Sequence, residues 1–256
     1  LRDLTTVINQ EYPDEARPSA LDREQAAHEA VALSRSWTYV ARQEYFDRLD
    51  SQAAGTGPPL TVLGESGLGK SALLANWGLR YQASHPDDLV LMHFVGASAA
   101  STDWTAMLTR FMGELKRQTG IEQEIPEQSA QLLSEFGHWL ALAAERKRIV
   151  LIVDALNQLE DREAALDLGW LPSALPAGAR VICSTLPGRP LDEIRRREWP
   201  TLELQPLTVP DRLRLVSRRL RRYGKRLSKP HRRRITQAQP CGNPLYLVAL
   251  LEELRL

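Results

Sequence analysis

The chain has 256 residues, of which 43% are hydrophobic and 25% are charged, and its formal net charge at pH 7 is +1. This length and composition suffice for one large folded domain, alone or with a small appendage, and they favour a folded chain over a disordered one. Acidic and basic residues nearly balance, so the overall charge gives no reason to expect a nucleic acid or an anionic membrane as partner.

Cysteine usage and hydropathy narrow the class of protein further. Cys183 and Cys241 lie far apart and form no CxxC or Cys/His pattern, which argues against a disulfide framework and a zinc site. The longest apolar runs are shorter than the roughly 20 residues that cross a bilayer. We therefore expect a cytoplasmic protein without a membrane span. Because the sequence begins at Leu1 and ends inside an expected helix, we interpret it as a segment of a longer chain.

Residues 1–57 are polar and are expected to form an N-terminal linker with one helix. The stretch 11–20, EYPDEARPSA, has the composition of a loop, and 21–37, LDREQAAHEAVALSRSW, has that of a helix. Glycines and prolines in 52–59, QAAGTGPP, end regular structure before the first apolar run.

From Leu60 onward, short apolar runs alternate with amphipathic segments of helix length. The runs are LTVL, LVLMHFV, RIVLIV, RVICST and TLEL, which begin at residues 60, 89, 148, 180 and 201. This alternation predicts an α/β domain over 58–207, in which helices flank a parallel sheet. One helix is predicted by apolar residues at helical spacing from Trp104 to Leu115, with Ser101 and Thr102 as its expected caps.

Helical patterns replace strand patterns after residue 207, so we assign 208–256 to a small helical lid domain. Twelve Lys and Arg lie between Arg212 and Arg234, the strongest local charge in the chain. Such a cluster suits nucleic-acid phosphates or an acidic partner. However, Leu213, Val216 and Leu220 keep a helical spacing and aromatic residues are few there, so we favour a solvated helix face and do not expect nucleic acid as a partner.

A strand pattern, the motif G-x-x-x-x-G-K-S and a helix pattern follow one another in LTVLGESGLGKSALLANW. In this motif the backbone N–H groups curl around phosphate oxygens, the helix N-terminus adds its dipole, the lysine adds a charge and the serine adds a hydroxyl for Mg²⁺. We therefore predict a nucleotide site here. The residues that would form it are Gly64, Glu65, Ser66, Gly67, Leu68, Gly69, Lys70, Ser71 and Ala72.

The apolar run 148–153 places Asp154 at the end of a second strand. An aspartate in this position holds Mg²⁺ in nucleotide hydrolases, so we expect Ser71 and Asp154 to bind the metal, and Lys70 and Asp154 to serve catalysis. The alternative is an aspartate that only caps the following turn. A third strand ends in Ser184 and Thr185, whose hydroxyls could sense a terminal phosphate.

Four stretches together resemble the NACHT-like members of the signal-transduction NTPases called STAND. They are YVARQEYFDRL at 39–49, GESGLGKS at 64–71, LIVDALNQL at 151–159 and CGNPLYL at 241–247. The first is similar to the family's hydrophobic-hydrophobic-Gly-Arg motif, with Ala41 in place of glycine, which implies that Val40 and Arg42 lie near adenine. The last is similar to the family's G-x-P signature, which implies that Pro244 approaches the base. By itself, it would also be an ordinary helix start with Asn243 as cap.

The resemblance implies a P-loop NTPase fold with five parallel strands in the order 5-1-4-3-2 and a helical lid that closes on the nucleotide. It implies ATP or ADP with Mg²⁺ as cofactors, effector and repeat domains elsewhere in a longer parent chain, and self-association on activation. Arg189 is the candidate for a charge near the γ-phosphate, because the family often has an arginine shortly after this strand. The alternative is a solvated loop arginine.

Hydrolysis requires a water in line with the γ-phosphate, which a carboxylate or an amide orients. Members of the family often have acids where this chain has Asn157 and Gln158. An amide orients water but does not accept its proton at neutral pH. We therefore expect a slow Mg²⁺-dependent ATPase with Gln158 beside the water, although Glu160, Asp161 or Glu65 could substitute.

Two alternatives remain open at this point. A nucleotide-binding scaffold that does not hydrolyse would also place amides after Asp154. A nucleic-acid-associated ATPase of the AAA+ type would share the same core, and stimulation of its turnover by DNA or RNA would distinguish it.

Overall fold

The computed structural model describes residues 18–36, 39–40 and 42–254, so Ala41 and most of the loop expected at 11–20 lie outside the described residues. Five strands form one parallel sheet in the order β2-β3-β4-β1-β5. From the opposite edge this order is 5-1-4-3-2, so the predicted fold is confirmed. The strands, each within one residue of its predicted apolar run, are β1 Leu60–Leu63, β2 Leu89–Phe94, β3 Ile149–Asp154, β4 Ala179–Ser184 and β5 Thr201–Glu203.

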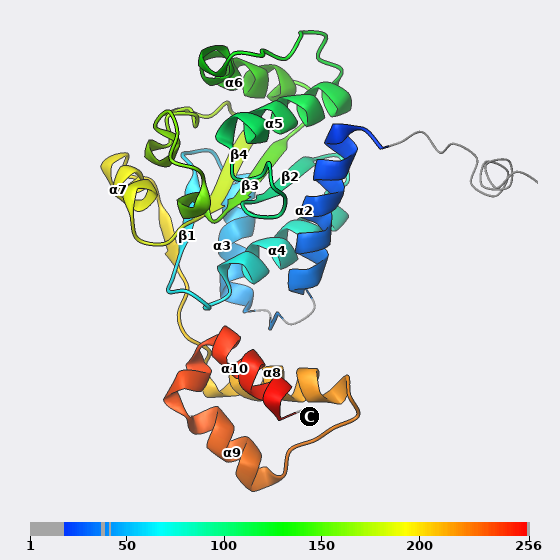
Figure 1. Ribbon diagram of the computed structural model, residues 1–256, viewed down its shortest axis with the longest axis vertical. Coiled ribbons are helices and arrows are strands. Elements are labelled where there is room, and N and C mark those ends of the chain that lie inside the picture. Colours follow the sequence, from blue (N-terminus) through cyan, green and yellow to red (C-terminus); the bar gives the residue numbers. More distant parts are fainter. Residues whose placement is uncertain (1–17, 37–38, 41, 255–256) are drawn as a thin grey trace, which may run out of the picture.

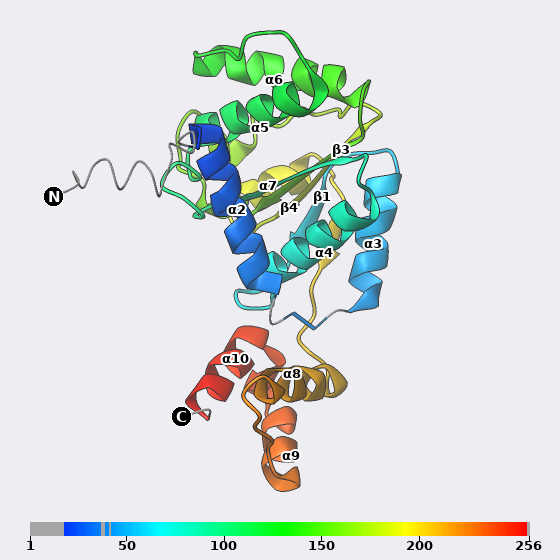
Figure 2. The ribbon, with the colours of Figure 1, turned by 90° about the vertical axis from the view of Figure 1, so that its right-hand side faces the viewer.

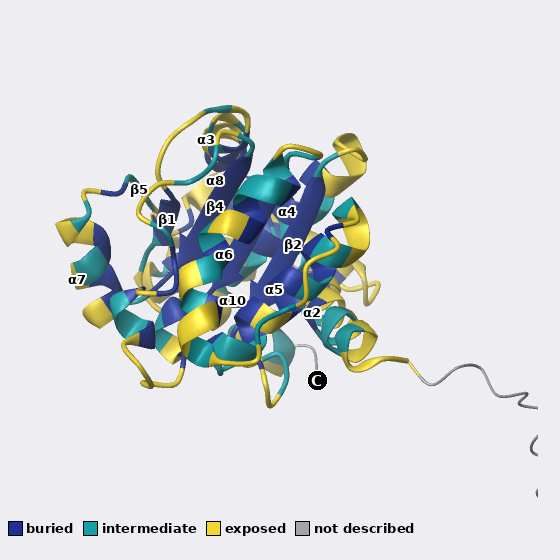
Figure 3. Cartoon of the chain, turned by 90° about the horizontal axis from the view of Figure 1, so that it is seen from above, coloured by how far each residue is buried: buried dark blue, intermediate teal, exposed yellow. Residues whose placement is uncertain are grey.

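Helices cover both faces of the sheet (Figures 1 and 2). Three of them share a hydrophobic cluster on one face, and the other three share a second cluster on the opposite face. Seen from above, strands β1 to β4 are largely buried, and the outer sides of the helices are exposed (Figure 3). The edge strand β5 is exposed at Thr201 and Glu203. The helices on one face are α2 Ala20–Ser36, α3 Gln43–Ala54 and α4 Lys70–Ser84. The helices on the opposite face are α5 Trp104–Thr119, α6 Ser129–Ala144 and α7 Arg189–Arg196.

The strands are apolar on both sides because both sides of the sheet are covered. Successive side chains of a strand point to opposite faces. Accordingly, Leu89 and Leu91 of β2 join the cluster beneath α5 and α6, whereas Val90 and Met92 join the cluster around α4. This is why the sequence showed continuous apolar runs in place of alternation.

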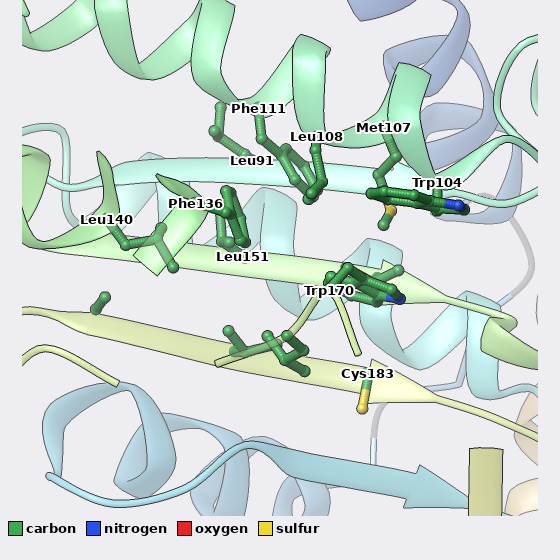
Figure 4. Close-up of a cluster of buried hydrophobic side chains, with 14 of the residues drawn as sticks. Leu91, Trp104, Met107, Leu108, Phe111, Phe136, Leu140, Leu151, Trp170 and Cys183 are labelled. Carbon is green, nitrogen blue, oxygen red and sulfur yellow. The ribbon is translucent and has the colours of Figure 1, made fainter. Parts of the chain in front are cut away.

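The cluster under α5 and α6 contains several large aromatic side chains (Figure 4). Trp104 and Phe111 of α5 meet Phe136 of α6 and Trp170 of the segment before β4, and each is at most 2% exposed. The predicted apolar stripe from Trp104 to Leu115 is therefore the core side of α5, as expected.

The expected caps of α5 were wrong. The helix is capped by Asp103, whose Oδ1 accepts a hydrogen bond from the Thr105 backbone N–H at 2.7 Å. Ser101 instead accepts hydrogen bonds from the backbone N–H groups of Gly96 and Ser98, and Thr102 donates to Glu160. The physical reason is that Ser101 and Thr102 serve the loop after β2, whereas Asp103 occupies the cap position itself.

The helix after the phosphate loop lies unusually close to the sheet at one residue. A Cβ atom added to Gly78 of α4 would lie 2.7 Å from the Met92 sulfur and 2.8 Å from Ile152 Cδ1. The glycine therefore sets how closely α4, and with it the phosphate loop, approaches β2 and β3.

The remaining helices form a separate group at one end of the molecule (Figures 1 and 2), which we call the lid. The lid has its own small cluster around Val216, Leu220 and Leu247. The triplet Arg232 to Arg234 is exposed to solvent. Within the described residues, no helix combines the length and the apolar character needed to cross a membrane. The lid helices are α8 Val209–Arg221, α9 Lys229–Gln237 and α10 Pro244–Glu253, with a 3₁₀ turn at Gln239–Gly242.

Candidate nucleotide-binding site

The phosphate loop spans 64–69, between the end of β1 and the start of α4. Gly67 and Gly69 have φ angles of 82° and 93°, in the left-handed region that favours glycine. A Cβ atom on Gly67 would lie 2.6 Å from Oδ1 of Asn243 in the lid. Gly67 thus has two reasons to be glycine, since it turns the loop and admits a lid side chain against it.

Lys70 begins α4, and its ammonium group folds back onto the loop. Its Nζ donates to the backbone oxygens of Gly64 at 2.6 Å and Glu65 at 3.2 Å. Burial lowers the pKa of Lys70 from its ordinary value, and the nearby charge of Asp154 opposes this shift. Gly64 and Glu65 therefore hold the lysine, and neither of them lines the cavity described below.

Asp154 ends β3 as predicted and is 5% exposed. The Ser184 hydroxyl, at the end of β4, donates to Asp154 Oδ1 and accepts a hydrogen bond from the Ala155 backbone N–H at 2.9 Å. Ser184 thereby orients the carboxylate. The neighbouring Thr185 is buried, donates to the Leu186 backbone oxygen and does not line the cavity.

The two amides after Asp154 have different surroundings. Asn157 Oδ1 accepts a hydrogen bond from the Leu186 backbone N–H at 3.1 Å, so this amide ties the loop after β3 to the loop after β4. Gln158 is exposed, and its side chain is free of such a tie among the described contacts. Both line the cavity. Gln158 is therefore the amide with the freedom to orient a water molecule.

These groups surround a cavity of about 370 Å³. Its walls come from the end of α2, the segment before α3, the phosphate loop, the ends of β3 and β4, and the lid. The lining residues are Ser34, Arg35, Tyr39, Val40, Arg42, Ser66, Gly67, Leu68, Gly69, Lys70, Ser71, Ala72, Asp154, Ala155, Asn157, Gln158, Ser184, Leu186, Leu207, Leu215, Pro244, Leu245 and Val248.

Part of the cavity lining is apolar. Val40, Leu215 and Pro244 come from three separate segments of the chain and line it together. Arg42 lies beside them, 7% exposed, with its guanidinium 4.4 Å from the centre of the Tyr45 ring and its Nη1 donating to the Gln205 backbone oxygen at 2.6 Å. The predicted set of Val40, Arg42 and Pro244 is thus brought together with the phosphate loop in one cavity.

The lid contacts the phosphate loop directly. Asn243 caps α10 by accepting from the Leu245 backbone N–H at 3.0 Å and from that of Tyr246 at 3.3 Å, as the sequence predicted. The same side chain donates through Nδ2 to the Ser66 backbone oxygen at 2.8 Å. The Leu245 N–H also lies 3.2 Å from the Gly67 backbone oxygen.

Mg²⁺ would have two protein ligands of the right chemistry here. Ser71 and Asp154 line the same cavity, and a hydroxyl with a carboxylate suits an ion that keeps several waters and takes phosphate oxygens. Among the described residues, no group of three or more His, Cys, Asp and Glu forms a metal cage elsewhere.

Several residues considered from the sequence lie away from the cavity. Arg189 forms ion pairs with Asp161 and Asp167, both at 2.6 Å, so the structure favours its role as a surface arginine. Glu160 accepts a hydrogen bond from Thr102 at 3.0 Å. Neither Glu160 nor Asp161 lines the cavity beside Gln158.

Sequence reasoning missed Ser34, Arg35 and Leu215 of the cavity wall. Ser34 and Arg35 lie in the last turn of α2, whose sequence contains no recognised motif. Leu215 lies within the basic segment, where the charges drew attention away from it. The apolar spacing of α8 was a signal that some residue there faces the body, although the spacing alone does not show what it faces.

The chain matches the NACHT domain family over residues 59–223. It is 27% identical to a TPR repeat-containing protein of Dictyostelium discoideum, over 98% of this chain and 19% of that protein. It is 32% identical to nephrocystin-3 of Xenopus tropicalis, over 81% of this chain and 16% of that protein. The chain therefore spans less than a fifth of either relative.

A Walker-type ATPase of Pyrococcus abyssi has a TM-score of 0.56 to this structure, at 14% identity, over 85% of this chain and 68% of that one. At this identity the likeness concerns the fold alone. The family match covers the phosphate loop, Asp154 and the first lid helix, which the structure brings to one cavity. The chain belongs to the NACHT domain family of P-loop NTPases.

Proposed function

We propose that this chain is the ATP- or ADP-binding switch module of a signalling NTPase of the STAND type, with slow Mg²⁺-dependent hydrolysis of ATP. One observation carries the proposal: the phosphate loop, Asp154 and the lid line the same cavity. A nucleotide bound there touches both the body and the lid, so its identity controls how the two are held together.

The proposed binding roles follow the chemistry of the lining residues. The phosphate loop from Gly64 to Ala72 binds phosphates, with Lys70 leaving the backbone oxygens of Gly64 and Glu65 to meet them. Ser71 and Asp154 hold Mg²⁺, which shields the charge of the phosphates when it is bound. Val40, Arg42 and Pro244, which line the same cavity, surround the base.

Slow turnover is inferred from the residues beside the expected water. Among the residues that line the cavity, Asp154 is the one carboxylate, and its Oδ1 is already bonded to Ser184. Gln158 orients water without taking its proton. Loss of a general base typically costs a factor of about 10² to 10⁴ in rate. Turnover is accordingly slow, with Lys70, Asp154 and Gln158 in the catalytic roles.

The surroundings of this module are part of the proposal. We place its boundaries at an N-terminal segment of 1–57, a nucleotide-binding domain of 58–207 and a lid of 208–256. The expected linker role of 1–57 does not extend to α2 and α3, because both helices pack on the sheet of the body. The relative from Dictyostelium discoideum is a longer protein named for its TPR repeats. This supports repeat domains in a longer parent chain. The proposal further includes effector domains, a cytoplasmic location and self-association on activation.

The non-hydrolysing scaffold is the second candidate. It is supported by the hydrogen bond from the Leu186 backbone N–H to Asn157. This bond gives Asn157 a structural role that does not involve a water molecule. A nucleic-acid-associated ATPase has less support, because Arg214 and Arg219 of the basic segment form ion pairs with Asp211 and Glu252.

The test is to denature freshly purified protein, identify any released nucleotide by chromatography, and then follow ATP turnover with Mg²⁺. We expect bound ADP or ATP and turnover well below one per second. Lys70→Ala should lower ATP affinity about a hundredfold, because it removes the charge from the phosphate loop. Lys229→Ala, at the exposed start of α9, is the matched control and should bind like the wild type.

Unchanged ATP affinity in Lys70→Ala would contradict the site. Rapid turnover by the isolated wild type would contradict the slow switch. Gln158→Glu separates the two candidates, since it restores a carboxylate next to Asp154 and should raise turnover in a slow ATPase. Bound ATP that never converts, in both the wild type and this variant, would favour the scaffold.

A further inference from the structure

The last turn of α2 forms part of the cavity wall. Ser34 and Arg35 both line it, together with Ser71 and Ala72 at the start of α4. The Arg35 side chain is exposed and therefore accessible to a ligand. Figure 2 shows α2 running beside α4, so the end of α2 lies near the helix N-terminus that follows the phosphate loop.

Arg35 contributes to a marked excess of positive charge. The ionisable side chains that line the cavity, tyrosine aside, are Arg35, Arg42, Lys70 and Asp154, three cations against one carboxylate. Two of the cations have partners: Arg42 donates to the Gln205 backbone oxygen, and Lys70 donates to Gly64 and Glu65. For Arg35, no side-chain hydrogen bond or ion pair is formed within the described part of the chain.

The position of Arg35 is set by contacts along the whole of α2. Its backbone oxygen accepts a hydrogen bond from Asn76 of α4 at 3.5 Å. Earlier in α2, the buried His28 accepts a hydrogen bond from the Phe94 backbone N–H at 3.0 Å. Glu24 accepts a hydrogen bond from the Ser98 hydroxyl at 2.7 Å. The helix is thus docked on the edge strand β2, and its last turn is held at the cavity in advance of any ligand.

We propose that Arg35 binds the phosphates of the nucleotide and so makes α2 a wall of the site. This inference rests on the proposed nucleotide binding. A guanidinium presents several N–H donors in a planar fork that matches phosphate oxygens, and such charge-assisted bonds are stronger than neutral ones. The exposed position of Arg35 lets it meet the ligand without first breaking an internal ion pair.

A consequence is that α2 responds to the nucleotide. A ligand that bonds to Arg35 restrains the last turn of α2. If the nucleotide lowers the affinity for a partner that displaces α2, linkage requires that this partner lowers the affinity for the nucleotide by the same factor. Val40 and Arg42 also line the cavity, so base and phosphates would contact residues on both sides of the connection from α2 to α3.

The experiment measures binding of ATP, ADP and adenosine to the 256-residue chain by titration calorimetry. Arg35→Ala should weaken ATP and ADP binding about tenfold or more and leave adenosine binding unchanged, because adenosine has no phosphates. Arg35→Lys should retain part of the affinity. Arg23→Ala is the matched control, because Arg23 is an exposed arginine of the same helix that bonds to the Pro18 backbone oxygen.

Amide hydrogen exchange gives a second measurement. ADP should slow exchange in the last turn of α2 in the wild type and in Arg23→Ala, but not in Arg35→Ala. Wild-type affinity for ATP and ADP in Arg35→Ala would overturn the inference. An equal loss for adenosine would also overturn it, since it would mean that α2 had shifted as a whole.

The result with Lys70→Ala separates this inference from the proposed function. If the wild type binds nucleotide, Lys70→Ala loses it and Arg35→Ala does not, the nucleotide site stands and only the role of Arg35 fails. If the wild type binds neither ATP nor ADP, the proposed function fails and the inference fails with it.

Discussion

The body and the lid of this molecule are stabilised to very different extents. The body, with its sheet and the helices α2 to α7, buries large side chains on both faces of the sheet, among them Trp77, Trp139 and Phe136 with no exposed surface. The lid has one small cluster, which includes Leu247 and Leu251 of α10. Because hydrophobic stabilisation grows with buried apolar area, the body accounts for most of the stability.

Polar contacts join the two regions, beside the apolar packing of Val40 of the body in the lid cluster. Asn243 donates to Ser66, Leu245 lies within hydrogen-bond distance of Gly67, and Arg218 of α8 donates to the Tyr39 backbone oxygen at 2.8 Å. Two of these bonds end on the phosphate loop itself. The region with the smaller core is thus attached to the loop that a nucleotide would occupy.

The largest effect should come from the body core. Phe136→Ala should lower the free energy of unfolding by about 3–5 kcal/mol, because it leaves a cavity between α5, α6 and the sheet. Leu247→Ala removes a side chain from the lid that, like Phe136, has no exposed surface. It should loosen the lid and leave the main unfolding transition near that of the wild type. Urea unfolding followed by tryptophan fluorescence makes the comparison, and an equal shift of that transition in both variants would contradict it.

A smaller effect should come from the contact between α2 and β2, where acid should weaken the body. The rings of His28 and His93 lie 4.3 Å apart, and each residue is 1% exposed. Burial, with a further contribution from the charge of Arg110, lowers the pKa of His28 to about 2 and that of His93 to about 3. Both rings are therefore neutral in the folded protein at all but strongly acidic pH.

The sign of the pH effect follows from these shifts. Below the ordinary pKa of 6.5, the unfolded chain binds protons that the folded protein does not, so stability is full above pH 6.5 and falls as the pH decreases. Each histidine should contribute about 1.4 kcal/mol per pH unit, or about 3 kcal/mol for the pair at pH 5.5. Urea unfolding at pH 7.5 and 5.5 measures this loss.

Variants assign the loss to the histidine pair. His93→Gln should remove about half of the pH dependence, whereas His138→Gln, on the exposed side of α6, should leave it unchanged. If His93→Gln loses as much stability between the two pH values as the wild type, the protonation of other groups governs the acid sensitivity.

The sequence predicted best what depends on local pattern. All five strands, the phosphate loop and Asp154 could be placed because apolar runs and a motif of fixed spacing mark them. The cap of α10 was also placed, since Asn243 followed by Pro244 is a local signal. The strand order required the family resemblance, because spacing along the chain does not state which strands become neighbours.

What could not be predicted depends on contacts between distant segments. Asn157 and Gln158 are adjacent and both line the cavity, yet only Asn157 bonds to Leu186, a difference set by the course of the chain after β4. Arg189 follows β4 as an arginine near the γ-phosphate would, but two aspartates outside the cavity hold it. Arg35 had no motif, and only the docking of α2 places it at the site.

The smallest effect should come from the bond between the lid and the phosphate loop, and Asn243 allows this bond to be separated from the cap of α10. Asn243→Ala removes both, at a cost of about 1 kcal/mol for the cap and about 1 kcal/mol for the bond to Ser66. Asn243→Ser keeps an oxygen that can cap the helix but lacks the Nδ2 donor that reaches Ser66. The serine variant should therefore keep α10 intact and release its first turn from the loop.

Hydrogen exchange of the Leu245 amide measures this release, because its N–H also donates to the Gly67 backbone oxygen. A loss of about 1 kcal/mol corresponds to roughly fivefold faster exchange at Leu245 in Asn243→Ser, with exchange at Leu251 unchanged because that residue lies within the lid core. Equal acceleration at both positions would mean that the whole of α10 unfolds, so that the cap matters and the loop contact does not. Acceleration at Leu245 alone would place the weakest point of the molecule between Asn243 and Ser66, at the loop where nucleotide phosphates are proposed to bind.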